Sequence, residues 1–302
     1  MSVAELESRE IQLEAPSGLW SEAWQRLRRN PGALVGFALV ALFAVVAIFA
    51  PWIAPDDPRA QDLSLLREGC CPGPSGEHLF GVDDLGRDQF SRIVYGARYS
   101  LLIGVVSVAV GLSVGLLLGA IAGYLGGIVD SVIMRLMDIM LSIPGLLLAI
   151  GIVAALGPGL TQIMIAVGAT QIPIFARLLR GSILAQREND FVLAARSVGV
   201  PRRTILASHI LPNAISPVIV QGTLALATAI IDVAGLGFLG LGPQDPSTPE
   251  WGTMLTNTTR YLQTAPHLAI IPGVAIVLSV LGFNLIGDGL REALDPKLRG
   301  RG

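Results

Sequence analysis

Several long windows of this sequence contain no Asp, Glu, Lys or Arg, and this feature limits the possible folds more than any other. They include residues 99–124, 139–156, 213–231 and 268–287. A helix needs roughly 20 apolar residues to cross a bilayer core of about 30 Å. Only 15% of the 302 residues are charged, whereas about a quarter of a soluble domain is charged. The chain lacks the polar outer layer of a soluble bundle, so it is predicted to be an all-α transmembrane protein.

Six spanning helices are predicted, with an extracytoplasmic loop between the first and the second. They cover about residues 33–53, 99–124, 132–156, 160–180, 213–241 and 267–287. Basic residues collect in short cytoplasmic loops, and Arg26, Arg28 and Arg29 stand directly before the first span. With the N-terminus inside, fourteen of the 21 Lys and Arg residues fall on inner segments and six on outer segments. We therefore expect a multi-pass protein of the cell membrane, embedded in the lipid bilayer, with both termini in the cytoplasm.

These spans divide the chain into four parts. Residues 1–30 form a cytoplasmic N-terminal segment, and residues 31–98 hold the first span and the outer loop. Residues 99–288 form the main transmembrane domain, and residues 289–302 form a cytoplasmic tail. The N-terminal segment lacks the basic start of a signal peptide, so the first span is interpreted as an uncleaved signal anchor.

The outer loop changes character along its length. Its first half is rich in proline, which predicts extended or irregular structure. Its second half carries apolar residues at the spacing of one helix face, namely Phe90, Ile93, Val94, Ala97 and Leu101. We therefore expect a short amphipathic helix that leads into the second span.

Both cysteines, Cys70 and Cys71, are adjacent in this outer loop. A disulfide between neighbouring residues is uncommon, given the usual Cα spacing of the bond. Exposed thiols or thiols linked to a partner are the favoured interpretation. No metal site is expected, since too few other ligands lie nearby.

The second span carries four glycines at a strict spacing of four residues: Gly111, Gly115, Gly119 and Gly123. This spacing places them on one helix face, where small residues allow helices to approach closely inside lipid. Packing within the subunit is the favoured interpretation, and contact with a second membrane subunit is the alternative.

The third span begins with charged residues and contains a proline. Arg135 and Asp138 lie one helical turn apart, and charged groups in the membrane usually pair. A structural ion pair between these two residues is therefore predicted. Pro144 is expected to kink the same helix.

The stretch 190–213 between the fourth and fifth spans predicts two short helices outside the lipid. Asn189 is a candidate N-cap for the first, and Gly199 suits its C-terminus. Pro201 fits the first turn of the second helix, and Pro212 is expected to break the helical pattern where the fifth span begins.

Each of these short helices has an apolar face. On the first it comprises Phe191, Val192, Ala195 and Val198. The pair can lie on lipid headgroups through Arg202 and Arg203, or it can dock into a groove on another protein. Docking is favoured, because the small Ala194 and Ala195 let a second backbone come close.

This segment resembles the cytoplasmic EAA loop of ABC-importer permeases. Five of its residues match that pattern: Ala194, Ala195, Gly199, Leu211 and Pro212. The glutamate of the pattern falls on Leu193, which is a departure. Three further stretches, FGVDDLGRDQFSRIVYGAR, LGFLGLGPQDPSTPEWG and FNLIGDGLREALDPKLR, resemble the second, C-type permease of dipeptide, oligopeptide and nickel importers. The resemblance implies a six-helix type I importer fold.

The resemblance also implies a set of partners. These are a second homologous permease, two ABC ATPases that use ATP and Mg, and an extracytoplasmic substrate-binding protein. It assigns ATPase coupling to residues 189–211 within a loop of residues 181–212. No nucleic-acid partner is expected.

The chain has a single lysine, Lys297, and a leucine follows it. A P-loop requires a lysine after a glycine-rich turn and before Ser or Thr. No cofactor is therefore expected in this chain, and an ATP-driven motor has to be another polypeptide.

Polar residues within the spans are candidates for a translocation pathway. Asp232 follows an uncharged stretch of the fifth span, and an acidic group at that depth is a functional candidate. It can attract the amino terminus of a peptide or bond to a neighbouring helix. Three amides, Gln171, Gln221 and Asn284, are weaker candidates, because ordinary interhelical hydrogen bonds explain them.

Acidic residues also gather in the outer loop, namely Asp83, Asp84 and Asp88. A solvated face is the favoured interpretation. Contact with a binding protein is the alternative, and a Ca²⁺ site is less favoured.

The predicted function is that of a permease subunit for di- or oligopeptides. Nickel, haem or another small ligand is the alternative cargo, and a stand-alone secondary carrier is a less favoured function. The chain is not expected to be an enzyme, since its three histidines (His78, His209 and His267) lie far apart and no HExxH motif occurs.

Overall fold

The structure is a computed structural model that describes residues 19–66, 70–256 and 258–294. Within these ranges the chain forms helices and one isolated β-bridge between Val82 and Asp88. Short helices flank the long ones: α2 (Leu19–Leu27), α4 (Ala50–Ile53), η1 (Leu63–Leu65), α13 (Trp251–Leu255) and η4 (Thr258–Tyr261).

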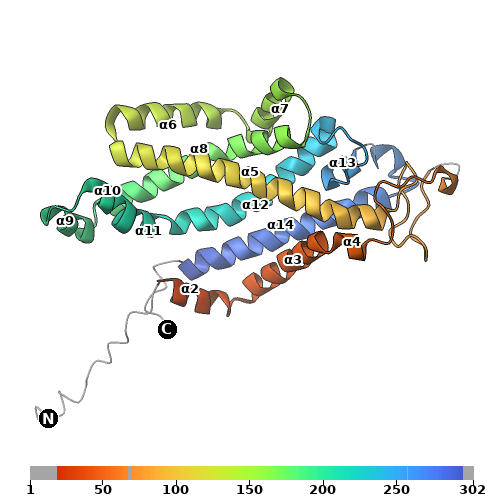
Figure 1. The fold of residues 1–302 in the computed structure, drawn as a ribbon, viewed down its shortest axis with the longest axis horizontal. Helices are drawn as coiled ribbons and strands as arrows, with labels where there is room; N and C mark the ends of the chain where they lie inside the picture. Colours follow the sequence, from red (N-terminus) through yellow and green to blue (C-terminus); the bar gives the residue numbers. More distant parts are fainter. Residues whose placement is uncertain (1–18, 67–69, 257, 295–302) are drawn as a thin grey trace, which may run out of the picture.

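Five helices are long and apolar enough to cross a membrane. They are α3 (Pro31–Ile48), α5 (Gln89–Leu125), α8 (Leu160–Arg187), α12 (Ser216–Leu236), which continues as the π-helical η3 (Gly237–Leu241), and α14 (His267–Leu294). A bent pair, α6 (Gly127–Ser142) and α7 (Gly145–Leu156), supplies a sixth span if the two are counted as one. The five long helices and α6 lie lengthwise in one bundle (Figure 1). The prediction of an all-α transmembrane fold is confirmed.

The third predicted span is broken rather than kinked. α6 and α7 meet at an angle of 94°. Ile143 has ψ 129° and Pro144 has ψ 131°, so both residues are extended. Proline supplies no N–H and pushes the residue before it out of the helical region. The expectation of a kink underestimated this effect, and α7 turns across the α13 end of the bundle (Figure 1).

α5 includes both the predicted amphipathic helix and the second span, without a break. Asp88 caps its start, and the Asp88 carboxylate accepts a hydrogen bond of 2.7 Å from the backbone N–H of Ser91. At 1.5 Å per residue, its 37 residues extend about 55 Å. The helix is therefore longer than a bilayer core, and its first turns join the outer loop.

The glycine face of α5 packs against α8 of the same chain. A Cβ atom on Gly111 would lie 2.6 Å from the Cβ of Gln171, and one on Gly119 would lie 2.5 Å from the carbonyl oxygen of Ala176. Gly115 and Gly123 face Phe175 and Ile183 in the same way. This geometry agrees with packing within the subunit.

Replacing Gly119 with leucine is expected to abolish the monodisperse folded protein. Overpacking a core ordinarily costs about 1–3 kcal/mol, and here the obstacle is backbone that cannot rotate away. A Cβ atom on Gly151 of α7 would meet nothing within 4 Å, so Gly151→Leu is the control. Size-exclusion profiles in detergent measure the outcome. Equal profiles for both variants would contradict close contact between α5 and α8.

Two ion pairs tie α6 to α8, and they differ from the predicted one. Asp138 pairs with Arg177, not with Arg135. Asp130 accepts two hydrogen bonds of 2.6 Å from the Arg180 guanidinium. α6 and α8 run antiparallel, so the two acidic residues of α6 meet arginines of the neighbouring helix. The predicted Arg135–Asp138 pair is wrong, and the Arg135 side chain is exposed.

Candidate functional site

The segment between α8 and α12 lies at the end of the bundle opposite α13 (Figure 1). It contains α9 (Asp190–Ser197), α10 (Arg202–Thr204), the π-helical η2 (Ile205–Ile210) and α11 (Leu211–Ala214). The helical backbone continues from α10 through η2 and α11 into α12, because the linking residues Ile205, Leu211 and Ile215 are all helical. The two predicted helices are present, and the second is joined to the fifth span.

Pro212 does not break this helix, in contrast to the prediction. In a regular α-helix the proline ring would clash with the carbonyl four residues earlier. Here the preceding turn is π-helical, with the Leu211 N–H donating to the carbonyl of Leu206. A π-turn is wider than an α-turn, so the chain accommodates Pro212 without a break.

Gly199 ends α9 in a Schellman motif. The Val200 N–H donates to the carbonyl of Ala195 over 3.1 Å, and the Gly199 N–H donates to that of Arg196 over 3.0 Å. Gly199 has a φ of +79°, which glycine adopts without strain. An added Cβ would meet nothing within 4 Å. Glycine is therefore required here by the backbone angle and not by a lack of space.

Asn189 and Pro201, the other two predicted boundary residues, do not have the roles that were predicted for them. Asn189 occupies the N-cap position of α9, but its side chain makes no cap and donates to Gln186 Oε1 over 2.8 Å. Pro201 is the N-cap of α10, directly before the first turn rather than inside it.

The predicted apolar face of α9 is divided between two environments. Val192 (0% exposed) and Ala195 (8%) are buried in the main core, beside Ile183, Ile205 and Ile210. The outer face of α9, defined as Phe191, Leu193, Ala194 and Val198, is exposed, and Val198 is 79% exposed. Val192 and Ala195 hold α9 on the bundle, while the outer face remains available to a partner.

The four pathway candidates lie on three different helices. Gln171 on α8 is buried against Gly111, so it belongs to the helix contact. Gln221 lines a cavity with Leu178 and Arg291. Asp232 lies eleven residues further along α12, about 16 Å along the axis, and Asn284 is half-buried on α14. Within the described residues, the Asp232 carboxylate has no hydrogen bond or ion pair.

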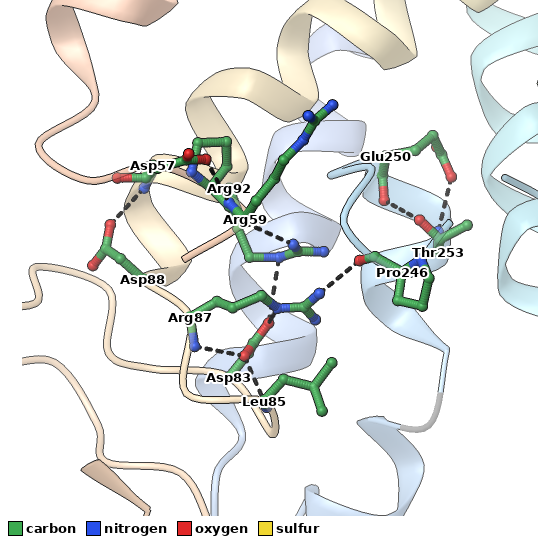
Figure 2. A network of polar contacts seen from close by, with 12 residues as sticks. Asp57, Arg59, Asp83, Leu85, Arg87, Asp88, Arg92, Pro246, Glu250 and Thr253 are labelled. Atoms are coloured by element: carbon green, nitrogen blue, oxygen red, sulfur yellow. Dashed lines mark hydrogen bonds and ion pairs between the residues drawn. The ribbon is translucent and has the colours of Figure 1, made fainter. Parts of the chain in front are cut away.

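At the α13 end, a polar network joins the outer loop to the loop after η3. Figure 2 shows Arg87 between Asp83 and Pro246. The Arg87 Nε donates to Asp83 over 2.7 Å, and its Nη1 donates to the carbonyl of Pro246 over 2.6 Å. Arg92 Nη1 donates to the carbonyl of Pro58 over 3.1 Å.

The acidic residues of the outer loop are therefore not a solvated face. Asp83 and Asp88 are buried, and burial raises the pKa of the half-buried Asp84. The expectation was wrong because Arg87 and Arg92 follow close behind in the sequence and neutralise Asp83.

Glu250 was not among the residues predicted from the sequence, and it is the most deeply buried acid in the described part of the chain. It is 1% exposed and caps α13. Its carboxylate accepts hydrogen bonds from the N–H groups of Gly252 and Thr253, both 2.8 Å, and from Ser100 Oγ at 3.3 Å. Burial raises its pKa, although these donors oppose the shift. The only sequence signal was an acidic residue before Trp251, a position suited to an N-cap.

Three possible metal ligands also meet at this end. Asp56, His78 and Asp88 bring ligand atoms within 4.8 Å of one another. The Nδ1 of His78 is already 3.0 Å from Asp88 Oδ1, and Asp88 also caps α5. The group is thereby explained as a structural contact between the outer loop and α5.

Cys70 and Cys71 form a disulfide. Cys71 is buried beside Ala265 and Leu268. Exposed or partner-linked thiols were therefore the wrong expectation, because the two sulfur atoms are bonded to each other and Cys71 is buried.

The run 111–115 reads Gly-Leu-Ser-Val-Gly, which has the form of a hydrolase nucleophile elbow. Such an elbow needs a sharp turn between a strand and a helix. This run lies inside α5, and the Ser113 hydroxyl donates to the Ala109 carbonyl over 2.7 Å. The run therefore belongs to the glycine face.

Comparison with known proteins agrees with this architecture. Residues 115–300 match the family model of the binding-protein-dependent transport system inner membrane component, and residues 18–68 match the N-terminal TM domain of oligopeptide transport permease C. In the solved inward-facing structure of the MetNI methionine ABC transporter, one chain aligns with a TM-score of 0.56 and 21% identity. That alignment covers 68% of this chain and 96% of the other.

Two curated relatives extend the match to nearly the whole chain. The dipeptide transport system permease protein DppC of Alkalihalophilus pseudofirmus is 48% identical over 93% of this chain and 90% of its own length. The glutathione transport system permease protein GsiD of Shigella flexneri is 51% identical over 93% and 91%. The chain therefore belongs to the family of binding-protein-dependent transport system inner membrane components and has the fold of a type I ABC importer permease.

Proposed function

We propose that this chain is a membrane subunit through which an ATP-driven importer passes small peptides across the cell membrane. The relatives at about half identity are named for dipeptide and glutathione transport, and both of these cargoes are small peptides. The family works with ATPase and substrate-binding partners in general. For this chain we propose a second homologous permease, two ATPase subunits and an extracytoplasmic binding protein.

The observation that carries the proposal is the outer face of α9. Exposed apolar side chains on a helix that is itself anchored by buried residues suit docking into a groove on a protein. The helix that follows Gly199 continues through η2 and α11 into α12 and along it to Leu236. A push on α9 is therefore transmitted to a spanning helix that carries Asp232.

This assignment places the α9 end in the cytoplasm, together with both termini. Arg26, Arg28 and Arg29 precede α3 at the same end of the bundle as α9 (Figure 1), in agreement with the distribution of basic residues across membranes. ATP and Mg would be bound by the ATPase partners, and this chain would contribute no cofactor.

Uptake by the complete complex in proteoliposomes tests the function. Labelled dipeptide is expected to accumulate only when the binding protein and ATP are supplied on opposite sides. Accumulation of a nickel chelate or haem without peptide uptake would favour the alternative cargo. Uptake by this chain alone would favour a secondary carrier.

Asp232→Asn is expected to lower peptide uptake about tenfold. The carboxylate has no partner among the described residues, and losing an attraction of about 1.4 kcal/mol to a peptide amino group corresponds to a factor of ten. Assembly should be unchanged, and Asp232→Glu should retain most uptake. Full uptake by the Asn variant would contradict a role of Asp232 in the translocation pathway and would leave it a structural residue.

A further inference from the structure

A cavity of about 380 Å³ lies under α9, between this helix and the ends of α5 and α8. Three arginines line it, and each comes from a different element. Arg187 is the last residue of α8, Arg196 lies in the last turn of α9, and Arg202 begins α10. The function proposed above does not use this cavity.

The charge in this cavity is unbalanced. No Asp or Glu lines it, and in the described part of the chain none of the three arginines forms an ion pair. Arg187 donates one hydrogen bond, over 3.0 Å, to the carbonyl of Gly123. Arg177 and Arg180, earlier on the same helix, both have an aspartate partner on α6. The lack of a partner is therefore a feature of this cavity and not of the arginines of α8 in general.

Arg187 is half-buried, and Arg196 and Arg202 are exposed, so water and salt screen part of their mutual repulsion. An anion between them would remove the rest. Guanidinium presents paired N–H donors that match the oxygens of a phosphate group. The cavity therefore suits a phosphate-bearing ligand better than a metal ion or a neutral solute.

The remaining walls indicate which kind of phosphate compound fits. Leu125, Ile183 and Ile205 form an apolar side, and Leu125 is the last residue of a spanning helix and is largely exposed. α5 ends here, next to the end of its predicted span at residue 124, so this wall adjoins the level of the lipid headgroups, whereas α8 continues seven residues beyond its predicted span. A free phosphate ion would leave this apolar side uncovered, whereas a phospholipid covers it with its glycerol and acyl portion.

We propose that the cavity binds the headgroup of an anionic phospholipid, with its phosphate among Arg187, Arg196 and Arg202. Arg196 lies four residues after the buried Val192, so it projects from the bundle side of α9. Phe191, Ala194 and Val198 of the outer face lie on the other side, whereas Leu193 stands one turn before Arg196 and borders it. A lipid in the cavity and a protein on the outer face can therefore be bound together, and the lipid fixes α9 against the spans.

The test compares lipid retention by the purified full-length chain. Native mass spectrometry after exchange into phosphatidylglycerol or phosphatidylcholine should show one retained phosphatidylglycerol, held at least about tenfold more tightly than phosphatidylcholine, which corresponds to about 1.4 kcal/mol. The double variant Arg196→Gln with Arg202→Gln should lose this preference. Arg203 is exposed like Arg196 and Arg202 but does not line the cavity, so Arg203→Gln is the matched control and should keep the preference.

Three results would overturn the proposal. The first is an unchanged preference in the double variant, and the second is an equal loss in Arg203→Gln, which would indicate general surface charge. The third is displacement of the lipid by millimolar inorganic phosphate, which would assign the site to a free anion. Monodisperse elution of all variants verifies that the chain has folded.

Discussion

Replacing Glu250 with alanine is expected to prevent the accumulation of folded protein. The substitution leaves the N–H groups of Gly252 and Thr253 and the hydroxyl of Ser100 without their buried acceptor. Each buried unsatisfied donor costs about 1–3 kcal/mol, so the total loss is at least about 3 kcal/mol. That is a large share of the 5–15 kcal/mol by which a domain is typically stable.

Thermal unfolding in detergent, followed by size-exclusion chromatography, measures this loss. Asp245→Ala is the control, because Asp245 lies in the same loop and is exposed, and its carboxylate accepts hydrogen bonds from the N–H and hydroxyl of Ser247. Equal stability of Glu250→Ala and the wild type would show that this network does not hold the α13 end together.

Glu250 is also expected to make the stability of the folded protein depend on pH. Since burial raises the pKa of Glu250, the folded state binds this proton more tightly than the unfolded state. Stability from this group is therefore greatest below the ordinary glutamate pKa of 4.5 and declines as the pH rises toward the folded value. Glu250→Gln is expected to remove that decline, and an unchanged pH profile would contradict the raised pKa.

Replacing Gly199 with valine is expected to uncouple ATP hydrolysis from uptake while membrane insertion stays normal. The Gly199 φ of +79° costs a side-chain-bearing residue about 1–2 kcal/mol, which corresponds to about tenfold in an equilibrium. The Schellman turn would open, and α9 would lose its fixed angle to the helix that leads into α12.

The control for this variant is Gly199→Asn, since asparagine tolerates the left-handed region better than other residues. It should retain most uptake, whereas the valine variant should hydrolyse ATP with little transport. Equal uptake by the two variants would show that the backbone at Gly199 plays no part in coupling.

Much of the bundle could be predicted from the sequence, because long segments without charged residues indicate which helices lie in the lipid. The glycine spacing on α5 also predicted a close helix contact within the subunit, since a regular helix fixes which residues share a face, but it did not identify α8 as the partner. The prediction failed where neighbours distant in sequence decide the outcome. Asp138 had an arginine within one turn, yet Arg177 on α8 is its partner.

Local sequence also could not separate the buried from the exposed residues of α9. Ala194 and Ala195 are identical and adjacent, and only the packing of Ala195 in the main core distinguishes them. Glu250 was missed for the same reason, because Ser100, which helps to bury it, lies 150 residues away. Pro144 predicted a kink in the third span. It did not predict the 94° angle between α6 and α7, which depends on how these two helices pack.

Photocrosslinking from the outer face of α9 tests whether this face docks on an ATPase subunit. Val198 is the position of choice, because it is 79% exposed, whereas Val192 on the same helix is fully buried. A crosslinker at Leu117, an exposed residue within the span α5, serves as the lipid-facing control. In the assembled complex, we expect the Val198 crosslinker to capture the ATPase subunit and the Leu117 crosslinker to capture lipid. Capture of lipid alone from Val198, throughout the ATP cycle, would contradict it.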